Sequence, residues 1–158
     1  LRPFFNYDAV FGTVLNRFVV QAVSGCPLTI YGKGGQTRGY INLRDTLECV
    51  RLAVESPAAP GELRVFNQYT ETFSVLELAE RVREAGSRLG LDVGIEHLEN
   101  LRGEAESHYY NPVHSGLSEL GLVPHFLDED VLVELMGVVR EFADHVEPRV
   151  LRPEVAWK

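Results

Sequence analysis

The sequence predicts an α/β fold in which helices alternate with short strands. Amphipathic stretches with apolar residues at helical spacing are separated by short apolar runs. Glycine, proline or polar residues stand on both sides of each run. Two capping boxes, Asp45 with Glu48 and Ser74 with Glu77, stand before amphipathic stretches and mark helix starts. The apolar runs are too few and too interrupted for a complete doubly wound sheet.

The first third of the chain predicts a helix, two strands and a second helix. Apolar spacing predicts the first helix over residues 9–24, and Gly25 ends it. Apolar runs at 28–31 and 40–43 predict strands on either side of a glycine-rich loop. A helix over residues 45–55 follows.

The rest of the chain continues the alternation. In order, we expect a loop at 57–61, a strand at 63–67, a helix at 74–89, a strand at 92–98, an irregular polar stretch at 100–111, a short helix opened by Pro112 and stopped by Gly121, an amphipathic helix at about 128–145, and an extended tail to Lys158.

Composition limits the class of protein and its partners. The 158 residues are 45% hydrophobic and 24% charged, as in an ordinary globular domain. The net charge of -8 argues against a nucleic-acid partner, which favours a basic face. Cys26 and Cys49 lack Cys-x-x-Cys spacing, so we expect two reduced thiols in a cytoplasmic protein. No apolar run approaches the length of a membrane span and no signal peptide is visible, so no membrane partner is expected.

The most informative stretch is YGKGGQTRGY, residues 31–40. Its glycines and cations are typical of a phosphate site, but the spacing of a P-loop is absent. Thr37 stands where the last glycine of Gly-x-Gly-x-x-Gly would be. That fingerprint also needs a strand before it and a helix after it, whereas this loop has a predicted strand on each side. We therefore do not expect it to bind a dinucleotide in the standard way.

Two arginines in loops, Arg38 and Arg102, are candidates to clamp a diphosphate, because guanidinium pairs with phosphate oxygens in a bidentate way. Gln36 can add an amide contact, and a tyrosine of the loop can stack or donate a hydrogen bond. The alternative is that the arginines are surface ion-pair partners, with Asp45 or Glu104 as the acids.

Several kinds of chemistry find no support in the sequence. His108 and His114 do not have the spacing of helical zinc motifs, so no metal is expected. There is no Gly-x-Ser-x-Gly elbow for a serine nucleophile. No tyrosine is followed by lysine four residues later, so the chain lacks the proton-transfer pair of short-chain dehydrogenases. We therefore assign no catalytic residue.

The order of elements resembles the C-terminal half of extended short-chain dehydrogenase/reductases, the NAD-dependent epimerase/dehydratase family. Within that group the resemblance is to the UDP-sulfoquinovose synthases, and it covers essentially the whole chain. The stretches that carry it are YDAVFGT (7–13), LNRF (15–18), YGKGGQTRGY (31–40), RVFNQYTETFSV (64–75), EAESHYYN (104–111) and the ending Trp157-Lys158.

The resemblance implies an activity for a longer parent protein. Enzymes of this family convert UDP-glucose and sulfite to UDP-sulfoquinovose for sulfolipid, with a tightly bound NAD that is recycled. The NAD fingerprint and the catalytic residues belong to the N-terminal half. Residues 1–158 would then be the C-terminal, UDP-sugar-binding portion, inactive alone and poorly stable, because several of its elements pack on the missing Rossmann sheet in relatives. The full-length enzyme would be a homodimer.

The resemblance also implies site residues. Tyr31 would hold the uracil through its backbone, Arg38 and Tyr40 would approach the diphosphate and ribose, and Arg102 would grip the diphosphate. Either Glu104 or Glu106 would take the ribose hydroxyls. The additional substrate contacts implied are Gln36, Asn16 and Arg17. Gln68 and Thr70 replace a glycine-rich turn of relatives and receive no role.

Two alternatives remain open from the sequence. One keeps the fold and makes the chain half of a UDP-glucose 4-epimerase or 4,6-dehydratase, against which the FNQYTE and HYYN stretches argue. The other is a non-catalytic remnant that binds a nucleotide sugar.

Overall fold

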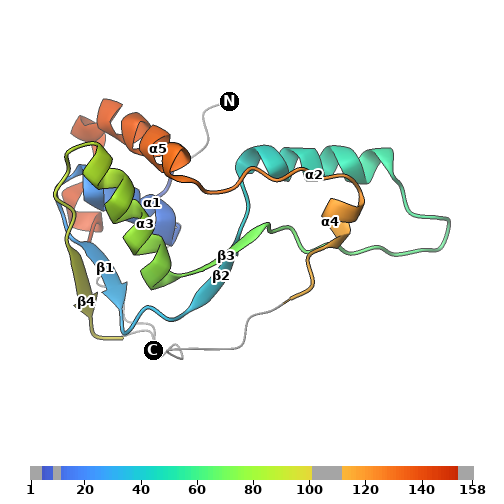
Figure 1. Ribbon diagram of the computed structural model, residues 1–158, viewed down its shortest axis with the longest axis horizontal. Helices are drawn as coiled ribbons and strands as arrows, with labels where there is room; N and C mark the ends of the chain where they lie inside the picture. The colour runs from blue at the N-terminus through green and yellow to red at the C-terminus, as the bar shows by residue number, and fades with distance from the viewer. Residues whose placement is uncertain (1–4, 9–11, 101–111, 153–158) are drawn as a thin grey trace. The chain divides into compact units, whose positions relative to one another are not determined.

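A computed structural model describes residues 5–8, 12–100 and 112–152, and it confirms the α/β class (Figure 1). The chain forms two compact units. The first consists of Leu1–Gln36, Ser74–His108 and Asp128–Lys158, and the second of Thr37–Phe73 and Tyr109–Leu127. Within the described residues, no helix has the length and apolar content needed to cross a membrane.

The first unit packs three helices beside a pair of parallel strands. Its elements are α1 (Val14–Val23), β1 (Leu28–Tyr31), α3 (Val75–Arg88), β4 (Ile95–Leu98), α5 (Glu129–Glu141), and two short 3-10 helices, η1 (Ala143–His145) and η2 (Pro148–Val150). β1 pairs with β4, Leu28 opposite Ile95 and Tyr31 opposite Leu98. The three α-helices pack on one another, and α1 and α3 contact β1. Burial of their apolar stripes, with Phe18, Ile30 and Met136 fully enclosed, builds the core of this unit.

A buried glutamine joins three parts of the first unit. Gln21 of α1 is fully buried, and its Nε2 donates to Oγ1 of Thr29 at 2.9 Å and to the carbonyl of Leu151 at 2.7 Å. Its Oε1 accepts from the backbone N of Thr29 at 3.2 Å. All the bonds are made inside the core, so this polar group fixes α1 against β1 and the C-terminal segment.

The helix ends of the first unit follow local signals. Thr13 caps α1 by accepting from the backbone N of Asn16 at 3.2 Å, so the helix begins later than the predicted residue 9. Gly25, with φ +70°, follows its end as predicted. α5 stops at Glu141 rather than near 145, and η1 continues it. β4 is shorter than the predicted 92–98.

The predicted capping box at the start of α3 is confirmed. Oγ of Ser74 accepts from the backbone N of Glu77 at 3.1 Å, and the Glu77 carboxylate accepts from the backbone N of Ser74 at 2.7 Å. Hydrogen bonds that the Glu77 carboxylate accepts from Ser74, first of all from its backbone N, lower the pKa of this carboxyl below its ordinary value.

A lowered folded pKa makes this cap sensitive to acid. The free energy that the cap contributes to folding is fully present above the pKa that glutamate has in the unfolded chain. It is lost as the pH falls through the lower pKa of the folded state. We expect Glu77→Gln, which still accepts the hydrogen bond, to remove a pH-dependent part of the unfolding free energy of about 0.5 kcal/mol between about pH 5 and pH 3. Urea titrations at several pH values measure this, and an identical acid limb in the variant would contradict it.

The second unit is smaller. Its elements are β2 (Thr37–Tyr40), α2 (Leu43–Glu55), β3 (Glu71–Ser74, with Ser74 beyond the unit's last residue) and α4 (Gly116–Glu119), and β2 pairs with β3. Cys49 and Leu52 of α2 meet Leu117 and Leu122 in a small buried cluster, against which Phe66 packs. Cys49 is buried and Cys26 half-buried, and both are free thiols, as expected.

Two predicted boundaries in the second unit are wrong. The strand lies at 37–40 rather than 40–43. α2 begins at Leu43 rather than at residue 45, because Asn42 caps it: its Oδ1 accepts from the backbone N of Arg44 at 3.0 Å. Asp45 is therefore in the first turn of α2 rather than at its cap. Its carboxylate binds elsewhere, as described below.

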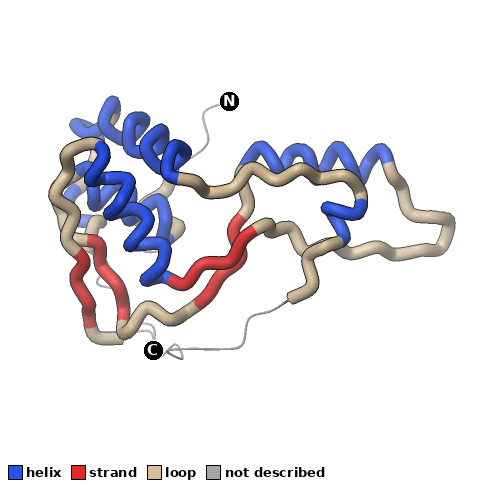
Figure 2. The backbone as a smooth tube through the Cα atoms, viewed as in Figure 1, coloured by secondary structure: helices blue, strands red, loops and turns tan. Residues whose placement is uncertain are grey.

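The strand predicted at 63–67 is also wrong, since Figure 2 shows this part of the chain as loop and the strand lies at Glu71–Ser74. A strand needs a hydrogen-bonded neighbour, and the described residues provide none for 63–67. The short helix expected from Pro112 starts at Gly116, and Gly121, with φ +102°, follows it.

Candidate functional site

The glycine-rich loop connects β1 to β2, as predicted, but these strands lie in different sheets. The carbonyls of Gly34 and Gln36 accept from the first amides of α3, Leu76 N at 3.0 Å and Val75 N at 3.1 Å. With Ser74 capping Glu77, the first three amides of α3 are used. A phosphate at this loop therefore cannot be bound by the N-terminus of α3 and needs side-chain cations instead.

Gly34 is required for this arrangement. Its φ is +76°, and a Cβ there would lie 2.8 Å from Cγ2 of Ile30 and 3.2 Å from Cβ of Leu76. The glycine therefore lets the loop approach β1 and α3 closely. This explains part of the glycine pattern by packing rather than by a ligand.

The predicted site residues of the first unit lie on α1, at the end of β1 and in the loop. Tyr31 is half-buried at the end of β1, and Gln36 is buried. Nδ2 of Asn16 donates to the carbonyl of Asn6 at 3.0 Å. Arg17 is buried, and its Nη2 donates to the carbonyl of Thr29 at 3.4 Å. Asn16 and Arg17 thus make bonds within the unit, and their contact with substrate stays a prediction.

The structure brings Arg38 and Tyr40 together on β2 of the second unit. They are two residues apart in a strand, so their side chains lie on the same face. Arg38 is exposed and its Nη1 donates to the carbonyl of Thr37 at 2.9 Å. Burial raises the pKa of the Tyr40 phenol, and the Arg38 guanidinium offsets part of that rise. This pairing presents a permanent cation beside a neutral phenol, which suits a phosphate and a hydroxyl.

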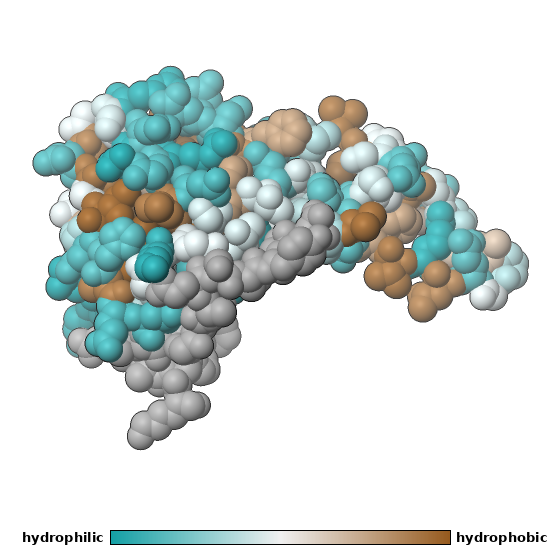
Figure 3. Space-filling view, turned by 60° about the horizontal axis from the view of Figure 1, so that its bottom comes forward, coloured by the Kyte–Doolittle hydropathy of each residue, from teal (hydrophilic) through white to brown (hydrophobic). Residues whose placement is uncertain are grey.

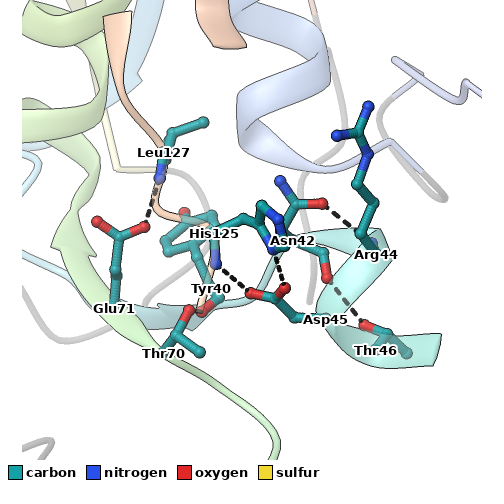
Figure 4. Close-up of polar contacts among 9 residues, drawn as sticks. All are labelled: Tyr40, Asn42, Arg44, Asp45, Thr46, Thr70, Glu71, His125 and Leu127. Carbon is teal, nitrogen blue, oxygen red and sulfur yellow. Dashed lines mark hydrogen bonds and ion pairs between the residues drawn. The ribbon is translucent and has the colours of Figure 1, made fainter. Parts of the chain in front are cut away.

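Neighbouring residues hold Tyr40 in place (Figure 4). The backbone N of Thr70 donates to the Tyr40 carbonyl at 2.9 Å, and the Thr70 hydroxyl lies 3.4 Å from the same oxygen. The Tyr40 ring packs on Phe73 of β3 with centroids 5.6 Å apart. Thr70, which received no role in the sequence analysis, therefore holds the strand that carries the candidate residues.

Two carboxylates hold the segment before α5, as Figure 4 shows. Asp45 is buried, and its oxygens accept from the backbone N of His125 at 2.7 Å and pair with His125 Nδ1 at 2.6 Å. Glu71 accepts from the backbone N of Leu127 at 2.6 Å. The carboxylate of Asp45 thus bonds to His125 rather than to Arg38, the ion pair considered from sequence. Sequence reasoning missed the Asp45–His125 pair because no spacing rule links residues 80 positions apart.

The FNQYTE stretch binds the segment 112–114. Nδ2 of Asn67 donates to the carbonyl of Val113 at 2.7 Å, and the Tyr69 hydroxyl donates to the carbonyl of Pro112. The ring of Tyr69 stacks on His114 with centroids 4.3 Å apart. No cluster of potential metal ligands occurs in the part of the chain that the structure describes. Arg102, Glu104 and Glu106 lie outside the described residues, so their roles stay predictions.

Comparison with known proteins shows close relatives that are longer than this chain. No family model matches. The chain is 54% identical over 154 residues to the chloroplastic UDP-sulfoquinovose synthase of Spinacia oleracea, a match that covers 98% of the chain and 32% of the relative. It is 45% identical to the UDP-sulfoquinovose synthase of Sulfolobus acidocaldarius, over the whole chain and 41% of the relative. The chain therefore spans about a third to two-fifths of these relatives.

Solved structures agree on the fold. The UDP-glucose 4-epimerase of Thermotoga maritima with UDP-glucose matches with a TM-score of 0.70 at 22% identity, over 90% of this chain and 43% of that one. The UDP-glucuronic acid 4-epimerase of Bacillus cereus, in a complex that includes NAD, matches with a TM-score of 0.64 at 23% identity, over 82% of this chain and 40% of that one. The sequence thus resembles UDP-sulfoquinovose synthases over nearly the whole chain, and the fold is that of part of an extended short-chain dehydrogenase/reductase.

Proposed function

We propose that this chain is the UDP-sugar-binding portion of a UDP-sulfoquinovose synthase. The observation that carries the proposal is 54% and 45% identity to two such enzymes across 98% and 100% of the chain. The parent protein would convert UDP-glucose and sulfite to UDP-sulfoquinovose, and the chain alone would bind the nucleotide sugar without turnover. A full-length homodimer, a cytoplasmic location and the assignment of residues 1–158 to the C-terminal portion are parts of this proposal.

The described residues do not fit a dinucleotide site at the glycine-rich loop. The loop lacks the Gly-x-Gly-x-x-Gly fingerprint, and the first three amides of α3, where a pyrophosphate would bind, are bonded to the loop and to Ser74. We therefore assign NAD to the part of the parent that this chain does not span.

The substrate contacts of the second unit are the best supported. The exposed guanidinium of Arg38 would pair with diphosphate oxygens, and the Tyr40 phenol, kept neutral, would donate to a phosphate or ribose oxygen. The proposed nucleotide contacts also include Tyr31 and Gln36. Asn16, Arg17, Arg102, Glu104 and Glu106 complete the proposed set.

A second candidate function is half of a UDP-glucose 4-epimerase. The match to the Thermotoga maritima epimerase favours it. At 22% identity that match shows the fold alone, whereas the identity to UDP-sulfoquinovose synthases is more than twice as high. The first proposal is therefore preferred.

Titration calorimetry with UDP-glucose tests the proposal. We expect the chain to bind, and Arg38→Ala to weaken binding roughly 10- to 100-fold, since a charge-assisted pair contributes about 1.5–3 kcal/mol. Arg83→Ala is the matched control, because Arg83 is an exposed arginine on α3 that pairs with Glu80. A chain that binds no UDP-glucose, or an equal loss in both variants, would contradict the proposed site.

A further inference from the structure

His97 of β4 is an exposed residue whose ring reaches the start of the glycine-rich loop. Its Nδ1 lies 2.8 Å from the carbonyl oxygen of Gly32. A carbonyl only accepts hydrogen bonds, so Nδ1 must carry a proton and donate it to this bond. Gly32 directly follows Tyr31, one of the proposed nucleotide contacts. His97 therefore acts on the backbone beside a candidate site residue, although it is not among the predicted site residues itself.

Gly32 is held by β4 on both of its backbone groups. Its N donates to the carbonyl of Leu98 at 2.9 Å, and its own carbonyl accepts from His97. The φ of Gly32 is +63°, a left-handed value that suits glycine, and the chain turns at residues 32–33. Further along, the carbonyls of Gly34 and Gln36 accept from the first amides of α3. The loop is thus held at its start by β4 and later by α3, and one of these bonds comes from an exposed side chain.

The two bonds to Gly32 set the direction of two consecutive peptide groups. No cis peptide bond occurs among the described residues, and in a trans peptide the carbonyl and the N–H point in opposite directions. Because the N–H of Gly32 points at Leu98, the carbonyl of Tyr31 points away from β4. Because the carbonyl of Gly32 points at His97, the N–H of Lys33 also points away from β4. An acceptor and a donor are thereby turned to the same side, which suits the adjacent N–H and carbonyl groups of a uracil ring.

We propose that His97 is a positioning residue for the nucleobase of the substrate. Its ring holds the peptide between Gly32 and Lys33 in the direction that aligns the backbone of Tyr31 and Lys33 with uracil. His97 would act through Gly32 and would not touch the substrate. The inference rests on the proposed function. Without the imidazole, the bond from Leu98 would still hold the first peptide group, but the second would have to be ordered at the moment of binding, which weakens affinity.

The position of His97 separates this role from general stability. His97 is exposed, and Figure 3 shows many hydrophilic side chains on the surface of the first unit. Glu96, the residue before it, points to the other face of β4 by strand alternation and pairs with Arg152 at 3.0 Å. Glu96→Ala therefore removes a polar contact of the same strand on the face that does not meet the loop, and it is the matched control.

Imidazole nitrogen shifts of this chain, measured without any nucleotide, test the hydrogen bond itself. At alkaline pH, where the ring is neutral, long-range proton–nitrogen spectra show which nitrogen carries the proton. We expect the proton on Nδ1 of His97. A proton on Nε2 would overturn the proposal, because Nδ1 could then not donate to Gly32. This result does not depend on whether the chain binds a nucleotide sugar.

Titration calorimetry with UDP-glucose tests the role of the bond. We expect His97→Ala to weaken binding roughly 5- to 10-fold, since one hydrogen bond contributes about that much. Its melting temperature should stay within about 2 °C of that of the unaltered chain, because the side chain is exposed. Glu96→Ala should change the affinity less than about 2-fold. If the unaltered chain binds no UDP-glucose, the proposed function fails and this inference with it, whereas unchanged affinity in His97→Ala would overturn this inference alone.

Two amide variants distinguish the hydrogen bond from the mere presence of a polar side chain. In His97→Asn an amide N–H takes the place of Nδ1, and in His97→Gln the amide lies one bond further out, at the place of Nε2. We expect the asparagine variant to bind UDP-glucose within about 3-fold of the unaltered chain, and the glutamine variant to be as weak as alanine. An asparagine variant that recovers no affinity would overturn the proposal.

Discussion

Replacing Gly34 with alanine is expected to lower the free energy of unfolding by about 3 kcal/mol. The left-handed φ of +76° costs a residue with a Cβ about 1–2 kcal/mol. The added Cβ would also lie 2.8 Å from Ile30 and 3.2 Å from the Cβ and backbone N of Leu76, and such overpacking costs about 1–3 kcal/mol. Urea denaturation followed by circular dichroism measures the change.

Gly25→Ala is the matched control for the crowding at Gly34. Gly25 has a similar φ of +70°, but nothing lies within 4 Å of a Cβ placed there. We expect a loss of about 1 kcal/mol for this variant. An equal loss of unfolding free energy at the two positions would show that Gly34 is not packed closely against β1 and α3 as described.

Replacing Gln21 with leucine should also lower the free energy of unfolding, by about 3 kcal/mol. The variant loses three hydrogen bonds and leaves the hydroxyl and backbone N of Thr29 and the carbonyl of Leu151 without these partners in the core. Each buried polar group left unsatisfied costs about 1–3 kcal/mol, and the added apolar side chain recovers only part of the sum.

Ser87→Ala provides the comparison for Gln21→Leu. The Ser87 hydroxyl donates to the Arg83 carbonyl at 3.0 Å on the exposed side of α3, so its loss should change stability by less than about 0.5 kcal/mol. If Gln21→Leu were no more harmful than this exposed change, the buried network would not be what joins α1, β1 and the C-terminal segment.

The sequence predicted those features of the fold that depend on neighbouring residues. The α3 capping box, the end of α1 at Gly25 and the strand at Leu28–Tyr31 all follow local rules. The partner of that strand could not be predicted, since β4 lies more than 60 residues further along the chain. The start of α2 was misplaced because Asn42 and Asp45 are both good capping residues, and the pairing of Asp45 with His125 leaves Asn42 as the cap.

In the candidate site, too, the features set by neighbouring residues could be predicted from the sequence, and the contacts between distant segments could not. The proximity of Arg38 and Tyr40 follows from strand periodicity once β2 is located. Thr70, Asn67 and Tyr69 hold backbone carbonyls of distant segments, and no pattern in the sequence indicates which carbonyl a side chain will reach. The strand predicted at 63–67 has the right composition but no neighbour among the described residues, which is why local reasoning was wrong there.

The most direct test of the proposed function places this chain in the context of a complete enzyme. In the Spinacia oleracea UDP-sulfoquinovose synthase, the matched 154 residues would be replaced by this chain. After folding is confirmed by its melting temperature, the hybrid would be incubated with UDP-glucose and sulfite, and the products identified by mass spectrometry. If this chain is the UDP-sugar-binding portion of such an enzyme, a sulfonated nucleotide sugar forms. A folded hybrid that yields only UDP-galactose, the C4 epimer, or no product at all would contradict the proposal.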